Sequence, residues 1–453
     1  MSTTILTRRR FLKQVGGMAG ASAFATALSM HKMAAAAPLA DYKALVCVFL
    51  YGGNDGNATV VPRSGAAYTK YVAARGPLAI PAASILPINP TTAQGVDLGF
   101  PAYMSEMQTL FQQQRLAVLS NVGPLVAPIT RAQYQAESVP VPPNLFAHDE
   151  QQEQWQSLLS YSPNAQLTGW GGRTADLLRS LNGSSQVSLS ISLAGSNILQ
   201  IGRNVVQYQM HPGGTFSLDT YTPGANDETL AALRTIFAQS RSNMLDAAWL
   251  NKMNSAIATE QALAAALTAA PPLTTVFPDS GLSRQLKMVA RLIGISNQLG
   301  IKRQVFFVAQ GGFDTHGDQN VDHPVLLRNV SKSLDAFYKA TVEIGAASQV
   351  TTFTGSDFGR TLTNNEQGTD HAWGNHQFIM GGAVKGGDCY GTYPTIELGG
   401  PTDAGNEGRW IPTTSCDQLS ATLAKWFGVS PTDIPLVVPN IGRFASRDLG
   451  FML

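Results

Sequence analysis

Short apolar runs that end in turn residues recur along the chain and predict buried parallel strands. The clearest begins at Ala44, ends at Tyr51 and is followed by Gly52-Gly53-Asn54-Asp55-Gly56. Such runs are typical of strands that are buried on both faces of a sheet. The same character is found in Leu116 to Leu119, Gln304 to Ala309 and Val350 to Thr354.

Apolar residues repeat at helical spacing between these strands. The helical segments are Tyr103 to Gln113, Glu150 to Ser160, Thr229 to Leu267, Leu282 to Leu299, Val325 to Ile344 and Cys416 to Phe427. Because strands alternate with helices, the pattern indicates an α/β fold with a largely parallel sheet. Residues 185–280 differ, since an alternating stretch precedes a long alanine-rich one. We expect them to form an insertion or cap on one side of the sheet.

The first residues carry the features of a twin-arginine export signal. Arg8, Arg9 and Arg10 precede Phe11-Leu12-Lys13, and a glycine-diluted apolar run leads to an alanine-rich segment before Pro38. The run is too polar for a spanning helix, and small residues suit signal peptidase. We expect a signal peptide over 1–37 and one domain over 38–453, periplasmic or extracellular and without a stable membrane anchor. Such proteins fold before export, so the twin-arginine translocase is an expected partner and a bound metal is worth seeking.

The charge balance argues against nucleic acid or an anionic membrane surface as a partner. Basic residues number 31 and acidic residues 30, and charged residues make up 13% of the chain, so no strongly charged face is indicated. Three cysteines are widely spaced. Cys47 lies in an apolar run and is expected to be a buried small side chain, whereas Cys389 and Cys416 could form one disulfide in the periplasm.

Carboxylates and imidazoles follow the predicted strands, where an open α/β sheet places its ligands. The candidate metal ligands are Asp55, Asp314, His316, Asp357, His371 and His376. Together they would suit one or two divalent cations of the Zn, Mn, Ca or Mg type, which could hold a phosphate or sulfate ester. Taken singly, each aspartate could be a turn or N-cap residue, and each histidine a structural one.

Two further residues are candidates for binding or catalysis. His148 opens a predicted helix after Pro142-Pro143-Asn144, where first-turn N–H groups could face an anion. The alternative is an ordinary helix start whose Asp149 and Glu150 complement the macrodipole. Arg360 could clamp an anion, or form a surface salt bridge.

These motifs together resemble the domain-of-unknown-function 1501 family, within the alkaline phosphatase and sulfatase superfamily. The similar segments are Leu50 to Pro62, Phe313 to His316, Ser356 to Thr361, Gly368 to His371, Phe378 to Gly387 and Ile411 to Ser415. The resemblance implies a three-layer α/β/α fold and metal-ligand roles for the six residues above. It also implies a hydroxyl nucleophile at a helix start, where this chain has Ala147. Thr59 could substitute if its loop reaches the metal, or a water could attack directly.

Two functions follow as hypotheses. One is an exported metal-dependent hydrolase of phosphate or sulfate esters, acting on a small-molecule or polysaccharide ester. The other is a secreted binding or assembly protein that keeps the fold without catalysis, which the substitutions at Ala147 and Phe358 favour. Phe358 stands where phosphatases and sulfatases have a second ligand beside the aspartate.

Overall fold

A computed structural model of the chain describes residues 40–453 except 161–165, 184, 186, 216–227 and 240–242. The expected signal peptide over 1–37 therefore lies outside the described residues. The strands are β1 (Lys43–Leu50), β2 (Val61–Pro62), β3 (Ile85–Ile88), β4 (Leu98–Pro101), β5 (Leu116–Gly123), β6 (Ser190–Ser192), β7 (Tyr208–Gln209), β8 (Arg303–Gln310), β9 (Val350–Ser356), β10 (Asn375–Gly381), β11 (Cys389–Gly391) and β12 (Thr414–Ser415).

Helices connect these strands. They are α2 (Gly65–Arg75), α3 (Ser105–Gln112), α4 (Arg131–Gln135), α5 (His148–Ser157), α6 (Trp170–Leu178), α7 (Glu228–Ala238), α8 (Met244–Ala269), α9 (Gly281–Gly294), α10 (Gln319–Glu343), α11 (Cys416–Phe427) and α12 (Ile434–Val437). Within the described part of the chain, no helix has the length and apolar character needed to cross a bilayer.

The central sheet has the order β11-β5-β10-β9-β1-β8-β6-β7, with β12 also paired to β5. β1 lies between β8 and β9 and is parallel to both. β10 is antiparallel to β5 and β9. The sequence therefore predicted the parallel centre correctly, whereas β10 was absent from the predicted strands. A smaller sheet has the order β2-β4-β3.

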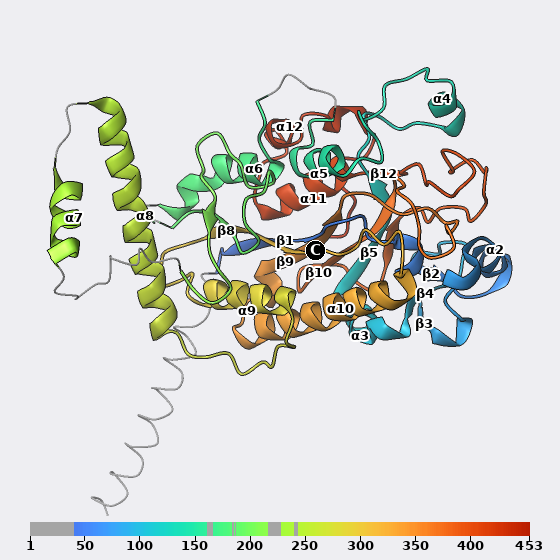
Figure 1. Cartoon of the computed structure of the whole chain (residues 1–453), viewed down its shortest axis with the longest axis horizontal. Helices are drawn as coiled ribbons and strands as arrows, with labels where there is room; N and C mark the ends of the chain where they lie inside the picture. Colours follow the sequence, from blue (N-terminus) through green and yellow to red (C-terminus); the bar gives the residue numbers. More distant parts are fainter. Residues whose placement is uncertain (1–39, 161–165, 184, 186, 216–227, 240–242) are drawn as a thin grey trace, which may run out of the picture.

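Helices cover both faces of the central sheet, which gives the expected three-layer α/β/α fold (Figure 1). The two faces of β1 explain why its sequence is almost wholly apolar. Val46 and Val48 face the core beneath α3, α9 and α10, while Cys47 and Phe49 face the core beneath α5, α6 and α11. Burial on both faces removes the polar alternation of a one-sided strand.

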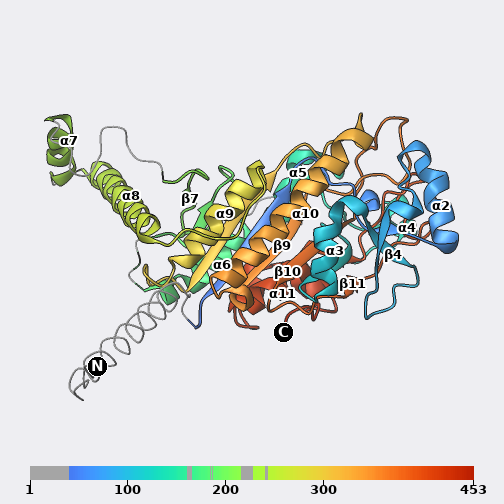
Figure 2. The ribbon, with the colours of Figure 1, turned by 90° about the horizontal axis from the view of Figure 1, so that it is seen from below.

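The segment expected as an insertion supplies one edge of the sheet and a helical projection. β6 pairs with β8, and β7 extends that edge. Leu263 and Leu267 near the end of α8 join the core beside α9, while α7 and the start of α8 stand away from the body (Figures 1 and 2). The three cysteines are buried free thiols, so Cys389 and Cys416 are not joined in this structure.

Candidate functional site

The site residues gather where the central parallel strands end. Asp314 and His316 follow β8, and Asp357 follows β9. His371 lies in the segment between β9 and β10, and His148 is the first residue of α5. Segments far apart in the chain thus meet at the carboxyl edge of the sheet, as the fold class predicts.

Three imidazoles surround the carboxylate of Asp314. Nε2 of His316 lies 3.1 Å from Asp314 Oδ1, and Nε2 of His371 lies 3.2 Å from the same oxygen. Nε2 of His148 lies 3.5 Å from Asp314 Oδ2. The Nε2 atoms of His316 and His371 are themselves 2.9 Å apart. We call these four residues the Asp314 cluster.

Each imidazole of the cluster has an oxygen atom beside its other nitrogen. Nδ1 of His148 lies 2.6 Å from Asp357 Oδ2, and Nδ1 of His371 lies 2.7 Å from the carbonyl oxygen of Phe146. Nδ1 of His316 lies 3.1 Å from Asp370 Oδ1. An acceptor beside Nδ1 favours the proton at that atom in the neutral ring and leaves Nε2 as a lone pair. Two Nε2 lone pairs 2.9 Å apart and facing the Asp314 carboxylate repel one another, so this arrangement requires a proton or a cation between them.

Asp357 supports His148 from a fully buried position. Its Oδ2 also accepts hydrogen bonds from the backbone N–H of Gly52 and the side-chain amide of Gln152. Its Oδ1 is buried and has no hydrogen-bond partner among the described residues. A buried carboxylate oxygen without a partner is costly and is expected to have a cation or a donor nearby.

Arg360 orients the Asp314 side chain through an ion pair. Its side chain is fully buried, and Nη1 donates to Asp314 Oδ1 at 2.8 Å and to the carbonyl oxygen of Gly52. Nε donates to Thr369 Oγ1, and Nη2 donates to the carbonyl oxygen of Thr369. The guanidinium thus occupies one oxygen of Asp314 and orients the other toward His148.

The local electrostatics follow from these contacts. The hydrogen bond to Asp357 raises the pKa of His148. Burial lowers the pKa of His371, although the Phe146 carbonyl opposes this. Burial raises the pKa of Asp314, but the hydrogen bond and charge of Arg360 outweigh it and the net pKa is lowered. Asp314 is therefore an anion at neutral pH.

Asp55 lies in a separate, fully buried set of contacts. Its carboxylate forms an ion pair with Arg75 at the end of α2 and accepts a hydrogen bond from Gln319. Burial raises its pKa, but the charge of Arg75 and the hydrogen bonds from Arg75 and Gln319 oppose this, and the net pKa is lowered. We call Asp55, Arg75, Gln319 and His323 the Asp55 network.

Thr59 and His376 also make their contacts away from the Asp314 cluster. Oγ1 of Thr59 donates to the carbonyl oxygen of Asp55 at 2.6 Å. The ring of His376 stacks on Tyr393, with centroids 4.9 Å apart, and its Nδ1 accepts the backbone N–H of Asn121. Burial lowers the pKa of His376 to about 3, which makes it a neutral core residue at pH 7.

Several residues of the site were not among the sequence candidates. Gln152 lies one helical turn after His148, and that spacing was the available signal that both side chains share a face of α5. Asp370 adjoins His371 in the sequence. The Phe146 carbonyl and Arg75 carried no sequence signal, because a backbone acceptor and a distant ion pair depend on the folded chain.

The side chains present fit a divalent cation. One donor atom from each of His148, Asp314 and His371 lies within 4.8 Å of the others. Two imidazole nitrogens and one carboxylate oxygen form a donor set that zinc and other transition-metal ions use in proteins, with a further position left for a substrate. The oxygen acceptors at Nδ1 are the outer partners that orient metal-binding histidines.

A family model described as "Protein of unknown function (DUF1501)" matches residues 42–434. The match spans both the Asp314 cluster and the Asp55 network. None of the curated proteins matches the chain in sequence.

Solved structures that resemble this chain include sulfatases and a phosphonate monoester hydrolase. The PsFucS1 sulfatase from Pseudoalteromonas sp. is 9% identical with a TM-score of 0.31, over 86% of this chain and 68% of that one. A putative sulfatase from Bacteroides thetaiotaomicron is 11% identical with a TM-score of 0.31, over 88% and 75%. The phosphonate monoester hydrolase SpPMH from Silicibacter pomeroyi is 9% identical with a TM-score of 0.33, over 88% and 77%. Similarity this distant bears on neither substrate nor mechanism.

Proposed function

This chain belongs to the family described as "Protein of unknown function (DUF1501)", and we propose that it is an exported, metal-dependent hydrolase of phosphate or sulfate esters. The observation that carries the proposal is the arrangement of the cluster histidines. Three rings each have Nδ1 beside an oxygen and Nε2 facing Asp314. Rings placed only for packing have no reason to share this orientation.

His148, Asp314 and His371 are the proposed ligands of the cation. A divalent cation at this position would supply positive charge that draws electron density from the phosphorus or sulfur of an ester. Asp357 keeps the His148 proton at Nδ1, and the Phe146 carbonyl does the same for His371. Arg360 acts as a positioning residue, because its N–H groups are already taken by Asp314, Gly52 and Thr369.

The cluster is open to solvent on the side where a substrate would approach. The side chains of Asp314 and His316 are 45% and 46% exposed. His316 has its Nδ1 beside Asp370, so the Nε2 lone pair of the neutral ring can accept a proton from an attacking water. An open rim suits an ester of a small molecule or of a polysaccharide chain.

The second candidate function is a secreted binding protein that holds a metal without catalysis. The observation in its favour is Ala147, the N-cap residue of α5, which provides no side-chain oxygen at the helix start. A hydroxyl nucleophile is therefore missing next to His148, and hydrolysis would require direct attack by water.

Metal content and ester hydrolysis together test the proposal. The mature protein would be purified without chelator, and its metals measured by plasma mass spectrometry beside Asp314→Asn and His148→Gln. The matched control is Asp279→Asn, because the Asp279 side chain is 94% exposed. We expect near-stoichiometric metal in wild type and control and little in the two cluster variants. Hydrolysis of 4-nitrophenyl phosphate or sulfate should follow the same order, with wild-type rates in the control and low rates in the cluster variants.

The outcomes separate the two candidate functions. A folded, metal-free wild type that does not take up added zinc or manganese would overturn the metal site. Stoichiometric metal without hydrolysis of either ester would favour the binding protein. Export is tested by replacing Arg8 and Arg9 with lysine, which should retain the full-length protein in the cytoplasm.

A further inference from the structure

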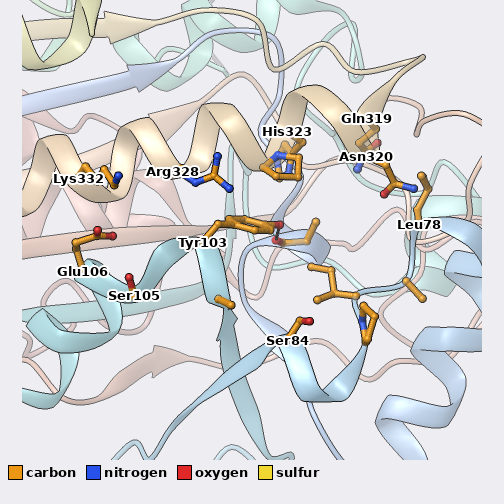
Figure 3. Close-up of a pocket in the computed structure, with 16 residues that line it drawn as sticks. Leu78, Ser84, Tyr103, Ser105, Glu106, Gln319, Asn320, His323, Arg328 and Lys332 are labelled. Atoms are coloured by element: carbon orange, nitrogen blue, oxygen red, sulfur yellow. Dashed lines mark hydrogen bonds between the residues drawn. The ribbon is translucent and has the colours of Figure 1, made fainter. Parts of the chain in front are cut away.

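A cavity of about 650 Å³ lies between α10, the start of α3 and the segment that follows α2. Figure 3 shows its residues, with the α10 side chains on one wall and Tyr103 and Glu106 facing them. Two members of the Asp55 network also line the cavity: Gln319, which donates to Asp55, and His323, whose Nε2 lies 3.1 Å from Asn54 Oδ1. The cavity is distinct from the Asp314 cluster.

Two cationic side chains line this cavity without a counter-ion. Arg328 and Lys332 are one turn apart on α10 and both border the cavity. Neither has an ion-pair or hydrogen-bond partner in the described part of the chain, whereas Lys339 farther along α10 pairs with Asp335 at 2.6 Å. Like charges at this spacing repel each other, so the pair favours an anion between them.

The charges of the side chains that line the cavity sum to one net positive charge. Glu106 lies across the cavity, and its Oε2 accepts a hydrogen bond from Ser331. Burial lowers the pKa of His323 to about 4, so this ring is neutral at pH 7. With two cations, one carboxylate and a neutral imidazole, the cavity carries one net positive charge, which suits a monoanion better than a dianion.

The wall opposite α10 combines Glu106, Ser84 and Ser105 with an apolar part. Leu78, Ile80 and Pro81 form the apolar part, together with the ring of Tyr103. Ligand sites typically combine such apolar walls with a few polar groups that fix orientation. The walls therefore suit a flat or aliphatic body attached to the charged head.

We infer that this cavity binds a small carboxylate with an apolar body. The carboxylate lies between Arg328 and Lys332, and the body packs against Ile80, Pro81 and Tyr103. Arginine pairs with a carboxylate through two parallel N–H donors, so Arg328 contributes most of the recognition of the head group.

Binding of 2-naphthoate to the mature protein, followed by isothermal titration calorimetry, tests this inference. The uncharged isostere 2-naphthamide serves as the comparison ligand. Arg328→Gln and Lys332→Gln each remove one charge, and Lys339→Gln is the matched control on the same helix. Ala102→Trp places a large side chain into the cavity, and circular dichroism checks that every variant is folded.

We expect saturable 1:1 binding of 2-naphthoate that weakens roughly ten-fold or more in Arg328→Gln, since hydrogen bonds to charged groups contribute at this level. Lys332→Gln weakens it less, Lys339→Gln leaves it unchanged, and Ala102→Trp abolishes it. 2-Naphthamide binds wild type at least about ten-fold more weakly. Absence of saturable binding, equal affinity in all charge variants, or a loss on Asp314→Asn in place of Arg328→Gln would overturn the inference.

Discussion

Asp55 and Asp314 follow neighbouring parallel strands of one sheet, yet the fold gives them opposite surroundings. Asp55 is fully buried and meets Arg75, a permanent cation, at the end of α2. Asp314 is 45% exposed and meets three imidazoles, which can be neutral donors to a metal. Each carboxylate has one oxygen paired with an arginine, Arg75 for Asp55 and Arg360 for Asp314. The second oxygen of Asp55 is buried and accepts the backbone N–H of Asn57. The second oxygen of Asp314, by contrast, is on the exposed side and faces His148, so only Asp314 offers an oxygen to a metal.

The two regions are connected by side-chain hydrogen bonds. Gln319 donates to Asp55 and accepts from Thr369 Oγ1 at 2.7 Å. Thr369 Oγ1 in turn accepts from Arg360, which donates to Asp314. These hydrogen bonds connect the Asp55 network, through Thr369 and Arg360, to the carboxylate of Asp314.

Removing Arg75 should have the largest effect on stability. Arg75→Met leaves the buried Asp55 carboxylate without its cation, and breaking one partner of a buried pair costs about 3–5 kcal/mol. Urea unfolding of wild type and variant measures the loss. The double variant Asp55→Leu/Arg75→Met removes both charges and should recover most of it. A single variant as stable as wild type would show that Asp55 does not depend on Arg75.

Sequence patterns were sufficient for the architecture, and they named four residues that the structure brings together in the Asp314 cluster. β1, β8 and β9 are buried on both faces, so their apolar runs were unambiguous. β10 begins with Asn375, His376 and Gln377, whose side chains make buried hydrogen bonds. Polar residues in a buried strand hide its apolar character, and this is why the pattern missed it.

Position along the chain could not distinguish the two aspartates. Asp55 and Asp314 both follow a strand and both lie among glycines, so the sequence gives them the same candidate role. Arg75 lies 20 residues after Asp55 on another element, and only the folded chain brings it there. His148, by contrast, opens a predicted helix, and His371 lies in the segment that follows the predicted strand Val350 to Thr354 and Asp357, on the side of the sheet where the fold class directs ligands.

Asp417 offers a third environment, a buried carboxylate without an ion pair. Burial raises its pKa to about 7. The folded state therefore binds this proton more tightly than the unfolded state, so the contribution of Asp417 to stability is fully present below its unfolded pKa of 3.8 and is lost as the pH rises to about 7. We expect a loss of roughly 4 kcal/mol, because one pKa unit corresponds to about 1.4 kcal/mol.

Urea titrations at several pH values measure this dependence. Asp417→Asn should abolish most of the decline between pH 4 and 7, whereas Asp279→Asn, an exposed control, should leave it unchanged. A decline of the same size in Asp417→Asn would assign it to other groups.

Zinc affinity should distinguish the surroundings of Asp314 from the Asp55 network. Asp357→Asn removes the carboxylate beside His148 Nδ1, and losing such an outer partner typically weakens metal binding by roughly 10–100-fold. Asp55→Asn is the matched change in the buried network and should leave zinc affinity within about three-fold of wild type while lowering stability. Zinc competition titrations measure both. If Asp55→Asn weakened zinc binding as much as Asp357→Asn, Asp55 would belong to the metal site after all.

The smallest expected effect concerns the start of α5, where Ala147 leaves the helix without a side-chain cap. Ala147→Ser should stabilise the protein by about 1 kcal/mol, because a serine hydroxyl at the N-cap can accept the backbone N–H of Glu150. Thermal unfolding measures this gain. Ala147→Gly is also a favourable N-cap, so it serves as the hydroxyl-free control for hydrolysis and not for stability. The same hydroxyl would stand beside His148, so a hydrolysis rate that rises in Ala147→Ser but not in Ala147→Gly would indicate that the Asp314 cluster can activate a nucleophile placed there.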